Sequence, residues 1–395
     1  MNILFATTSL PHGQTTGGEI ASQAFVDAMR KTGHFVQVFG FARDLSPPPR
    51  GSVSVELRAV ETASAGLAKY IWLGRSLLTG RPYVCEKFRA RRYLDLLRRA
   101  TRLGKADVLV TDHAQMGWLL PHARRLAKSV ILVAHNHEAP LYAAEAANQT
   151  RFLQRLMLKR DSHLLAQLEP RLARAADQVW TLSQNEQTAF SVMSGESKAT
   201  LMPLAGRSVR PKGDLMFPSF DIGLLGTWAW DVNGRGLNWF IDKVVPLLPD
   251  HVAICVAGRG SERVNNIHPN LNGLGYIEDP VSFMHQARVL AIPAVAGAGV
   301  QLKTIEAIAS GTPTVSTTLG VRGLDDLPAN VAIADTPEQF TEALLRQMLS
   351  APNNDAAQAW ASDRQARFEN LVAAQLGELD AAPASATPSY ESALA

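Results

Sequence analysis

Two stretches of the chain repeat one pattern, in which a short apolar run leads through a loop into a helix and then into a second apolar run. The first stretch begins with apolar residues 2–6, has helical periodicity over 19–32, and is apolar again at 35–41. The second begins at Asp221 and reaches its next apolar run at 251–258. The pattern is typical of a βαβ unit, whose strands are parallel and whose crossover is right-handed. It predicts an α/β fold with a doubly wound, Rossmann-like sheet in each half.

The domain organisation follows from length and local composition. A chain of 395 residues is too long for one ordinary hydrophobic core. Residues 206–219 are rich in proline, glycine and charge, which predicts a linker at the start of the second domain. We expect an N-terminal domain at 1–205, a C-terminal domain at 206–365, a helix at 366–380 that packs back on the N-terminal domain, and a disordered tail at 381–395.

The composition excludes several classes of protein. Hydrophobic residues make up 46% of the chain and charged residues 19%, which argues against disorder. The two cysteines, Cys85 and Cys255, lie in different halves, so neither a disulfide framework nor a zinc motif is expected. The first residues, MNILFAT, lack the basic region of a signal peptide, and no apolar run approaches about 18 residues. We expect a cytoplasmic protein.

The most informative segment is 293–324. A predicted buried strand ends there, and a loop containing Gly299 turns into a helix that we expect to start near Val300. The free N–H groups of a helix start bind anions, and Lys303 in the first turn would oppose the helix dipole unless an anion lay beside it. Glu306 shares the same face and could receive the hydroxyls of a ribose. The pattern indicates a nucleoside-diphosphate site, although a surface Lys–Glu pair on a capped helix would have the same spacing.

This segment resembles the donor-binding signature of the retaining glycosyltransferases of family 4. In that signature a glycine-containing loop leads into K-x-x-E-A-x-A-x-G-x-P-V-V-x-T and then into a short G-x-x-G loop. Weaker similarity extends over most of the chain. One position departs, because Ala298 stands where many members carry a glutamate that holds the donor sugar. The matching residues are Lys303, Glu306, Ala307, Ala309, Gly311, Pro313, Val315, Thr317, Gly320 and Gly323.

The resemblance implies a GT-B fold, in which two Rossmann-like domains face an interdomain cleft. It implies a hexosyltransferase that uses a nucleotide-diphosphate sugar as co-substrate and acts with retention, without a metal and without a separate cofactor. The chain has no Asp-x-Asp sequence that would hold Mg²⁺. We expect the acceptor to be a saccharide or a lipid-linked saccharide of polysaccharide biosynthesis. Two other functions stay open: a non-catalytic nucleotide-sugar-binding scaffold and a sugar-nucleotide epimerase.

The resemblance also implies roles for single residues of the second half. Glu306 would bind ribose, and Lys303 would act with a second cation to neutralise the departing diphosphate. Arg259, at the end of a predicted strand, is our first choice for that cation, and Arg235 is our second. The tryptophans near the first strand either line the base or sugar or pack in the core. The expected donor set is Gly226, Thr227, Arg235, Gly299, Val300, Lys303 and Glu306, with Trp228, Trp230 and Asn233 as further candidates.

Two loops of the first half are expected to face the reaction. By resemblance, the loop of Gly17 and Gly18 approaches the donor phosphates and the acceptor. His135 ends a predicted strand and matches a histidine that members place near the reacting sugar, with Asn136 and Glu138 beside it. A strand-end histidine is otherwise a satisfied polar residue. No third ligand accompanies His137 and Glu138, so no metal site is expected. The expected catalytic residues are His135, Lys303 and Arg259.

Charge is distributed unevenly along the chain. Residues 1–205 carry a net charge of +10 and residues 206–395 carry −7. The basic residues gather in two stretches, 69–105 and 151–174. A solvated arginine-rich face is one interpretation, and nucleic-acid binding is not expected because no recognised motif accompanies the charge. We expect peripheral association with an anionic inner-membrane surface, where each cation contributes about 1 kcal/mol.

Overall fold

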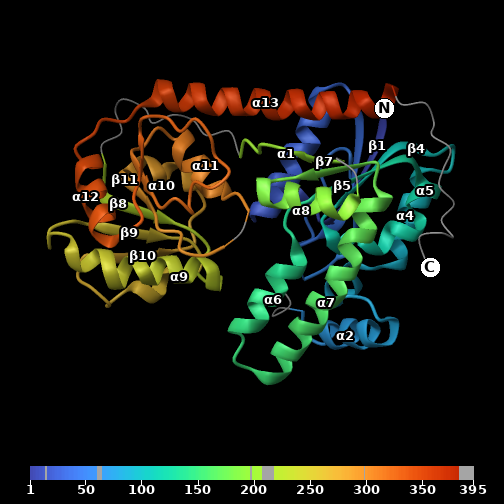
Figure 1. Ribbon diagram of the computed structural model, residues 1–395, viewed down its shortest axis with the longest axis horizontal. Coiled ribbons are helices and arrows are strands. Elements are labelled where there is room, and N and C mark those ends of the chain that lie inside the picture. The colour runs from blue at the N-terminus through green and yellow to red at the C-terminus, as the bar shows by residue number, and fades with distance from the viewer. Residues whose placement is uncertain (14–15, 60–64, 196–197, 207–217, 298, 382–395) are drawn as a thin grey trace. The chain divides into compact units, whose positions relative to one another are not determined.

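The computed structural model describes residues 1–381 except 14–15, 60–64, 196–197, 207–217 and 298. The chain divides into two compact units (Figure 1). Unit 1 comprises Met1–Pro203 together with Phe368–Ala395, and unit 2 comprises Leu204–Arg367. The expected linker therefore lies largely outside the described residues, and so does the expected tail from residue 382 onward.

Unit 1 contains a seven-stranded parallel sheet in the order β3-β2-β1-β4-β5-β6-β7. Its central strands are apolar and buried on both faces, as expected of a parallel sheet covered by helices. The strands are β1 (Asn2–Ser9), β2 (Phe35–Ala42), β3 (Ser52–Leu57), β4 (Ala106–Asp112), β5 (Ala127–Ala134), β6 (Gln178–Thr181) and β7 (Ala199–Leu201).

The helices of unit 1 connect these strands. Helix α1 has an amphipathic pattern that buries Phe25 and Met29, and Thr16 caps its start by accepting a hydrogen bond from the Glu19 backbone. Helices α6 and α7 pair as a hairpin, with α2 beside α7 (Figure 1). The helices are α1 (Gly17–Lys31), α2 (Ala68–Thr79), α3 (Tyr83–Phe88), α4 (Arg91–Ala100), α5 (Ala123–Leu126), α6 (Glu138–Asn148), α7 (Phe152–Ala175) and α8 (Gln184–Ser194), and a 3₁₀ helix spans Ala114–His122.

Unit 2 contains a six-stranded parallel sheet in the order β10-β9-β8-β11-β12-β13. Its strands are β8 (Phe220–Leu225), β9 (Ile254–Ala257), β10 (Leu271–Gly275), β11 (Ala287–Ile292), β12 (Thr314–Ser316) and β13 (Val331–Ile333). The helices are α9 (Asp231–Trp239), α10 (Pro280–Gln286), α11 (Leu302–Ala309), α12 (Pro337–Gln347) and α13 (Asn354–Ala381), and a π-helical turn at Phe240–Val244 continues α9.

Both sheets have the strand order of a doubly wound fold, which confirms the predicted class of two Rossmann-like α/β units. The order reverses between β1 and β4 in unit 1 and between β8 and β11 in unit 2. In open α/β sheets, ligands bind outside the carboxyl ends of the strands at such a reversal. The loops that follow these four strands are therefore the first places to look for a site.

Glycines bring the segments around the unit 2 reversal unusually close together. A Cβ on Gly236 in α9 would lie 2.1 Å from the backbone oxygen of Pro293, the residue after β11. A Cβ on Gly258 would lie 1.9 Å from the oxygen of Gly226, and Gly258 has a φ of 108°. Side chains at these positions would push the loops apart, so the glycines hold α9 against the end of β11.

Helix α13 runs without a break from Asn354 to Ala381, and the boundary between the two units falls inside it. The expected short helix at 366–380 is thus the second half of a longer one. Phe368 contacts Phe25 of α1 with ring centroids 5.1 Å apart, and the backbone oxygen of Gln375 accepts a hydrogen bond from Gln178. These contacts attach the end of α13 to the unit 1 sheet.

Within the described part of the chain, no helix combines the length and the apolar character needed to cross a bilayer.

Candidate functional site

Lys303 lies in the first turn of α11, directly after the loop that leaves β11. Its Nζ donates a hydrogen bond to Oδ1 of Asn233 at 3.3 Å and lies 5.2 Å from the centre of the Trp228 ring. Asn233 is held in turn by its own bond to the backbone oxygen of Thr227. The lysine therefore points toward α9 and the loop after β8. Lys303, Asn233 and Trp228, together with Gln301, line a small cavity.

The charge of Lys303 is poorly compensated. Burial and, to a smaller extent, the charge of Arg322 together lower the pKa of Lys303 to about 8. The start of α11 adds the positive end of a helix dipole. Two cations at a helix start form an arrangement that is stabilised by an anion.

Arg322 was missed by the sequence analysis. It lies between Gly320 and Gly323, in the short loop that was interpreted only through its glycines. Its Nη1 donates to the backbone oxygen of Leu319 at 2.6 Å. A Cβ on Gly297 would lie 3.3 Å from its Nη2, so the glycine leaves room for the guanidinium beside the loop that precedes α11. The signal available in the sequence was a lone arginine between two conformationally free glycines.

Glu306 lies one turn after Lys303 and is only 4% exposed, so it does not point into bulk water. Gly299, with a φ of 71°, is buried, and Val300 is half-buried. Helix α11 starts at Leu302 instead of near Val300, with Gln301 at its N-cap. Ala298 lies outside the described residues.

The two predicted second cations lie elsewhere in unit 2. Arg259 is exposed, and its guanidinium lies 5.6 Å from the centre of the Tyr276 ring. Arg235 is exposed on α9. The charge of Arg322, by contrast, acts on Lys303, which makes Arg322 a further candidate for the second cation.

The remaining predicted donor residues surround the end of β8. Gly226 is half-buried at the strand end, and Thr227 is exposed in the loop that follows. Trp228 is buried and donates from its indole to the oxygen of Ala257, so it packs in the core and also reaches Lys303. Trp230 is 70% exposed and is available to a ligand.

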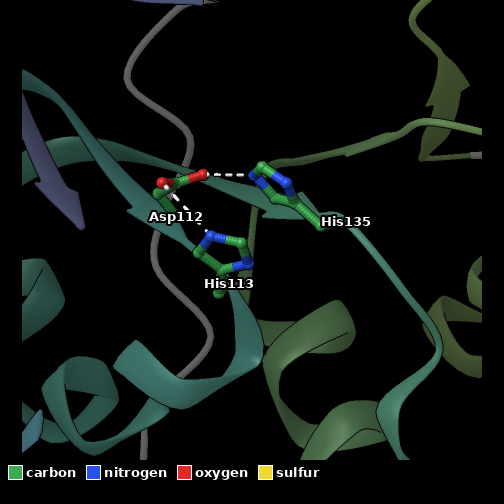
Figure 2. Close-up of side chains that lie close together, drawn as sticks. All are labelled: Asp112, His113 and His135. Carbon is green, nitrogen blue, oxygen red and sulfur yellow. Dashed lines mark hydrogen bonds and ion pairs between the residues drawn. The ribbon is translucent and has the colours of Figure 1, made fainter. Parts of the chain in front are cut away.

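In unit 1, His135 and Asp112 come together at the ends of β5 and β4 (Figure 2). Nε2 of His135 lies 2.7 Å from Oδ1 of Asp112, and both side chains are buried. The other carboxylate oxygen accepts hydrogen bonds from the hydroxyls of Thr7 and Ser22, each at 2.6 Å. The hydrogen bonds of Asp112, at the end of β4, thus connect it to β1, to α1 and to the residue that follows β5.

The ionisation of Asp112 fixes the direction of its bond to His135. Burial would raise the pKa of Asp112, but the charges of His113 and His135 and the hydrogen bonds it accepts hold it well below its ordinary value. An ionised carboxylate can only accept hydrogen bonds. Nε2 of His135 therefore carries a proton and donates it to Oδ1 of Asp112.

His113 is a second residue that the sequence analysis missed. Its backbone has φ 73° and ψ 151°, a conformation almost confined to glycine that costs of order 1–3 kcal/mol. Its ring stacks on that of His135 with centroids 3.7 Å apart and an angle of 28° between planes. Burial and then the charge of His135 lower the pKa of His113 to about 4, so it is neutral at physiological pH. A positive φ cannot be recognised from the sequence alone.

Asp112, His113 and His135 each offer a possible metal ligand atom, and these atoms lie within 4.8 Å of one another. Coordination by His135 Nε2 would require loss of its proton and of its bond to Asp112. The two imidazoles also lie face to face, whereas ligands of one ion usually spread around it. We therefore interpret the three residues as a hydrogen-bonded cluster.

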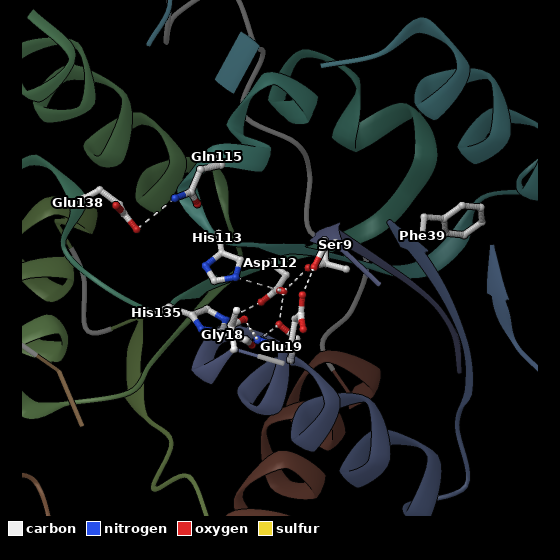
Figure 3. Close-up of polar contacts among 12 residues, drawn as sticks. Ser9, Gly18, Glu19, Phe39, Asp112, His113, Gln115, His135 and Glu138 are labelled. Carbon is white, nitrogen blue, oxygen red and sulfur yellow. Dashed lines mark hydrogen bonds and ion pairs between the residues drawn. The ribbon is translucent and has the colours of Figure 1, made fainter. Parts of the chain in front are cut away.

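The predicted glycine loop lies beside this cluster (Figure 3). Gly17 and Gly18 are the first residues of α1, and a Cβ on Gly18 would lie 3.5 Å from the His113 ring. Next to them Oε1 of Glu19 is buried and accepts from Ser9 and from Arg43, each at 2.6 Å. The loop thus contacts His113, which had not been predicted, as well as lying close to the predicted His135.

Asn136 follows His135 in the chain, and Figure 3 shows Glu138 next to Gln115, whose Nε2 donates to Oε1 of Glu138 at 3.3 Å. Burial raises the pKa of Glu138, and side-chain hydrogen bonds from Asn136 and Gln115 oppose the rise. The backbone N–H of Glu138 donates to Oε1 of Glu169 at 2.7 Å. Two buried carboxyl groups therefore meet at the start of α6, and burial together with the charge of Glu138 raises the pKa of Glu169 to about 7, against the backbone hydrogen bonds it accepts.

The cysteines contribute nothing to either site. Cys85 is buried, and burial raises the pKa of its thiol well above the ordinary value. Cys255 is half-buried in β9, and burial raises the pKa of that thiol too. Neither thiol is a reactive thiolate near neutral pH.

Comparison with known proteins locates the family resemblance in unit 2. Residues 219–349, most of that unit, match the family model described as glycosyl transferases group 1. No curated protein gives a significant match. The predicted likeness to family 4 is thus supported at the level of the group 1 domain.

Solved structures share the fold of the whole chain. Sucrose-phosphate synthase from Thermosynechococcus elongatus covers 96% of this chain and 98% of its own, at 17% identity and a TM-score of 0.64. Anabaena HepE in complex with UDP and glucose covers 95% of this chain and 99% of its own, at 16% identity and a TM-score of 0.62. The catalytic domain of starch synthase IV from Arabidopsis thaliana, bound to ADP and acarbose, covers 96% of this chain and 98% of its own, at 13% identity and a TM-score of 0.58. At these identities the likeness shows the fold.

Proposed function

We propose that the protein transfers a sugar from a nucleotide-diphosphate sugar to a saccharide or lipid-linked acceptor, with retention and without a metal. The observation that carries the proposal is the meeting of Lys303 and Arg322 at the start of α11. The match of this unit to a group 1 glycosyltransferase model supports it. The fold is also shared with proteins whose structures contain UDP or ADP.

A diphosphate suits the chemistry of this part of unit 2. Its negative charge would offset the repulsion between Lys303 and Arg322 and accept hydrogen bonds from the N–H groups at the helix start. Neutralising the charge that develops on the departing diphosphate is also where fixed cations accelerate transfer most. The buried carboxylate of Glu306, one turn on, is assigned to the ribose hydroxyls.

We assign the reacting sugar to His135 and the acceptor to Asn136 and the loop of Gly17 and Gly18 in unit 1. In the proposed retaining mechanism, the acceptor hydroxyl attacks on the face from which the diphosphate leaves, and a donor phosphate oxygen takes its proton. His135 and Asp112 orient and stabilise charge at the sugar, and they are not required to act as the base.

A thermal-shift screen with UDP-glucose, GDP-mannose and ADP-glucose tests donor binding, because a ligand stabilises the fold that binds it. We expect one of these sugars to raise the Tm of the wild type and not that of Lys303→Met. The exposed Lys243→Met serves as the matched control and should behave as wild type. Stabilisation by none of the three, or equal stabilisation of Lys303→Met, would contradict the proposed donor site.

Product analysis separates transfer from the other two functions. With the stabilising sugar and an added acceptor, NMR should show a new glycosidic bond with the anomeric configuration of the donor. Donor binding without turnover would indicate a scaffold. Conversion to an epimer, or release of free nucleotide without an added acceptor, would indicate an epimerase.

We further propose that unit 1 associates with an anionic membrane through the α2–α7 face, defined as the outer side of α2 and the first turns of α7. Arg160 of α7 donates to Ser76 of α2, so the two helices are joined. Leu156 lies one turn before Arg160 and Phe152 lies two turns before it, on the same side of α7. The exposed apolar residues are Leu67, Tyr70, Ile71, Leu77, Leu78, Phe152, Leu153 and Leu156, with exposures from 56% to 90%.

Charge complementarity selects a bilayer as the partner of this face. The segments 65–81 and 149–160 contain no aspartate or glutamate. An apolar face bordered by cations is typical of helices that lie in a membrane interface. Helix α4, which is the most basic part of the predicted stretch, buries its large apolar side chains at least partly, and so we exclude it from the face. The cations are Lys69, Arg75, Arg81, Arg151, Arg155, Lys159 and Arg160.

Cosedimentation with vesicles containing phosphatidylglycerol tests this face. We expect binding by the wild type at low salt, and a clear loss of binding by the double variant Phe152→Ser, Leu156→Ser. Val192→Ser, which alters an equally exposed apolar residue of α8, should bind as wild type. Vesicle binding unchanged by the double variant, or dimerisation of the free protein through this face, would contradict the proposal.

A further inference from the structure

We propose that His113 is a positioning residue for glycosyl transfer: its unusual backbone conformation holds its ring flat against His135, and together with Asp112 it fixes the orientation of the His135 imidazole. The inference rests on the proposed function, because it assigns a role within the same reaction. It concerns a residue that neither the predicted motifs nor the family match includes.

The contact between the two rings is the closest of its kind in the described chain. Their centroids are 3.7 Å apart, whereas the centroids of the other aromatic pairs in the described residues are at least 5.1 Å apart. A histidine that only filled core space would not need such contact. His113 also retains 15% of its side-chain surface, so it is not simply an interior residue.

The backbone at His113 points to the same conclusion. A conformation that favours glycine is retained by a non-glycine residue only where the surroundings impose it, and such residues cluster at functional sites. The backbone N–H of His113 donates to the oxygen of Val133 at 3.0 Å, which ties the strained residue to β5 two residues before His135. One strand thus carries His135 and also holds the backbone of the residue that stacks on it.

Each part of the His135 ring is therefore restrained. The bond from Nε2 to Asp112 sets the direction of the ring edge, and the stack with His113 sets the ring plane. A Cβ on Gly18 would lie 3.5 Å from the His113 ring, so a side chain longer than alanine would crowd that ring. A ring fixed in both respects can contact a sugar hydroxyl without first losing rotational freedom.

Two substitutions separate positioning from packing. His113→Gly removes the stacking ring and also relieves the backbone, so its Tm should equal or exceed that of the wild type. With the donor that gives the largest thermal shift, kcat should fall about 10- to 100-fold, while the donor KM stays within about threefold, because misplaced groups impair the transition state more than binding. His113→Phe keeps an aromatic stack and should recover most of the kcat.

The matched control is Asn266→Gly in unit 2, which relieves another non-glycine residue with positive φ (69°) far from this cluster in sequence. Its kcat should equal that of the wild type, and its Tm calibrates the effect of introducing glycine. A His113→Gly variant that keeps the wild-type kcat would overturn the inference. A loss of kcat matched by a fall of more than about 4 °C in Tm would also overturn it, because it would indicate loss of packing.

A readout independent of turnover distinguishes failure of this inference from failure of the proposed function. In protein labelled with ¹⁵N-histidine, the wild type should give a sharp Nε2–H signal for His135, which His113→Gly broadens through faster exchange and ring motion. An unchanged signal would overturn the inference even if the enzyme is active. Absence of donor binding and turnover in the wild type, with the predicted spectral change, would reject only the proposed function and the catalytic use of the positioned ring.

Discussion

Nζ of Lys303 donates to Oδ1 of Asn233 at 3.3 Å, so the acceptor of this half-buried cation is a neutral amide. Burial and Arg322 lower the pKa of Lys303 to about 8. The folded protein therefore holds a charge that it compensates poorly, and it holds this charge at the position where the proposed donor requires one. Such a residue should reduce stability while supporting function.

Lys303→Met should accordingly be more thermostable than the wild type at pH 7 and should lose donor binding. The folded-state pKa of Lys303 lies below its ordinary value of 10.5, so the cost of its charge is present below pH 8 and disappears as the pH rises from 8 to 10.5. The difference in Tm should narrow over that interval. Scanning fluorimetry at pH 7, 8, 9 and 10 measures it, and a constant difference would show that the charge of Lys303 is not the cause.

Arg322→Gln should weaken donor binding about 10- to 100-fold, since a hydrogen bond to a charged phosphate is worth about 1.5–3 kcal/mol. It should also raise the pKa of Lys303, because the charge of Arg322 contributes to its depression. Arg259→Gln and Arg235→Gln are the matched comparisons, and each should change the Kd less than threefold. Isothermal titration with the stabilising nucleotide sugar measures the Kd of all three variants. A larger loss of affinity in Arg259→Gln than in Arg322→Gln would indicate that Arg259 is the second cation.

Asp112→Asn should lower the free energy of unfolding by about 1–3 kcal/mol, because charge-assisted hydrogen bonds from Thr7, Ser22 and His135 become weaker or lose their partner. The pKa of Asp112 is depressed in the folded state, so its contribution is present above its ordinary value of 3.8 and is lost as the pH falls further. Urea denaturation at pH 3.5 and pH 7 tests both statements. The deficit of the variant should be smaller at the lower pH, and a deficit independent of pH would contradict the role of the charge.

The sequence was sufficient for the fold because alternation of apolar runs and amphipathic helices is a local property. It located the starts of β1 and β8 to within one residue and the start of α11 to within two, but it ended β1 three residues too early. It did not show that α9 continues as a π-helical turn at Phe240–Val244. Local periodicity cannot distinguish these helix types.

The site was less accessible to sequence reasoning. Lys303 and Glu306 were singled out because their segment resembles a donor-binding signature, whereas their spacing alone would also fit a surface ion pair. Arg322 and His113 were missed because each depends on a contact between segments distant in sequence: the loop after β12 with α11, and the end of β4 with the end of β5. The backbone conformation of His113 is set by those tertiary contacts and cannot be inferred from the type of residue at this position.

The carboxyl pair at the start of α6 gives a pH dependence of opposite sign to that of Asp112. Burial and the charge of Glu138 raise the folded-state pKa of Glu169 to about 7, above its ordinary value of 4.5. The folded protein therefore holds a proton that the unfolded chain releases, and the stability contributed by this group should fall as the pH rises from 4.5 through 7.

Glu138→Gln removes the neighbouring charge and should flatten this part of the Tm profile measured at pH 5, 6, 7 and 8. The exposed Glu342→Gln of α12 is the matched control and should keep the wild-type slope. A Glu138→Gln profile as steep as that of the wild type would show that burial alone, and not the facing carboxyl group, holds the proton on Glu169.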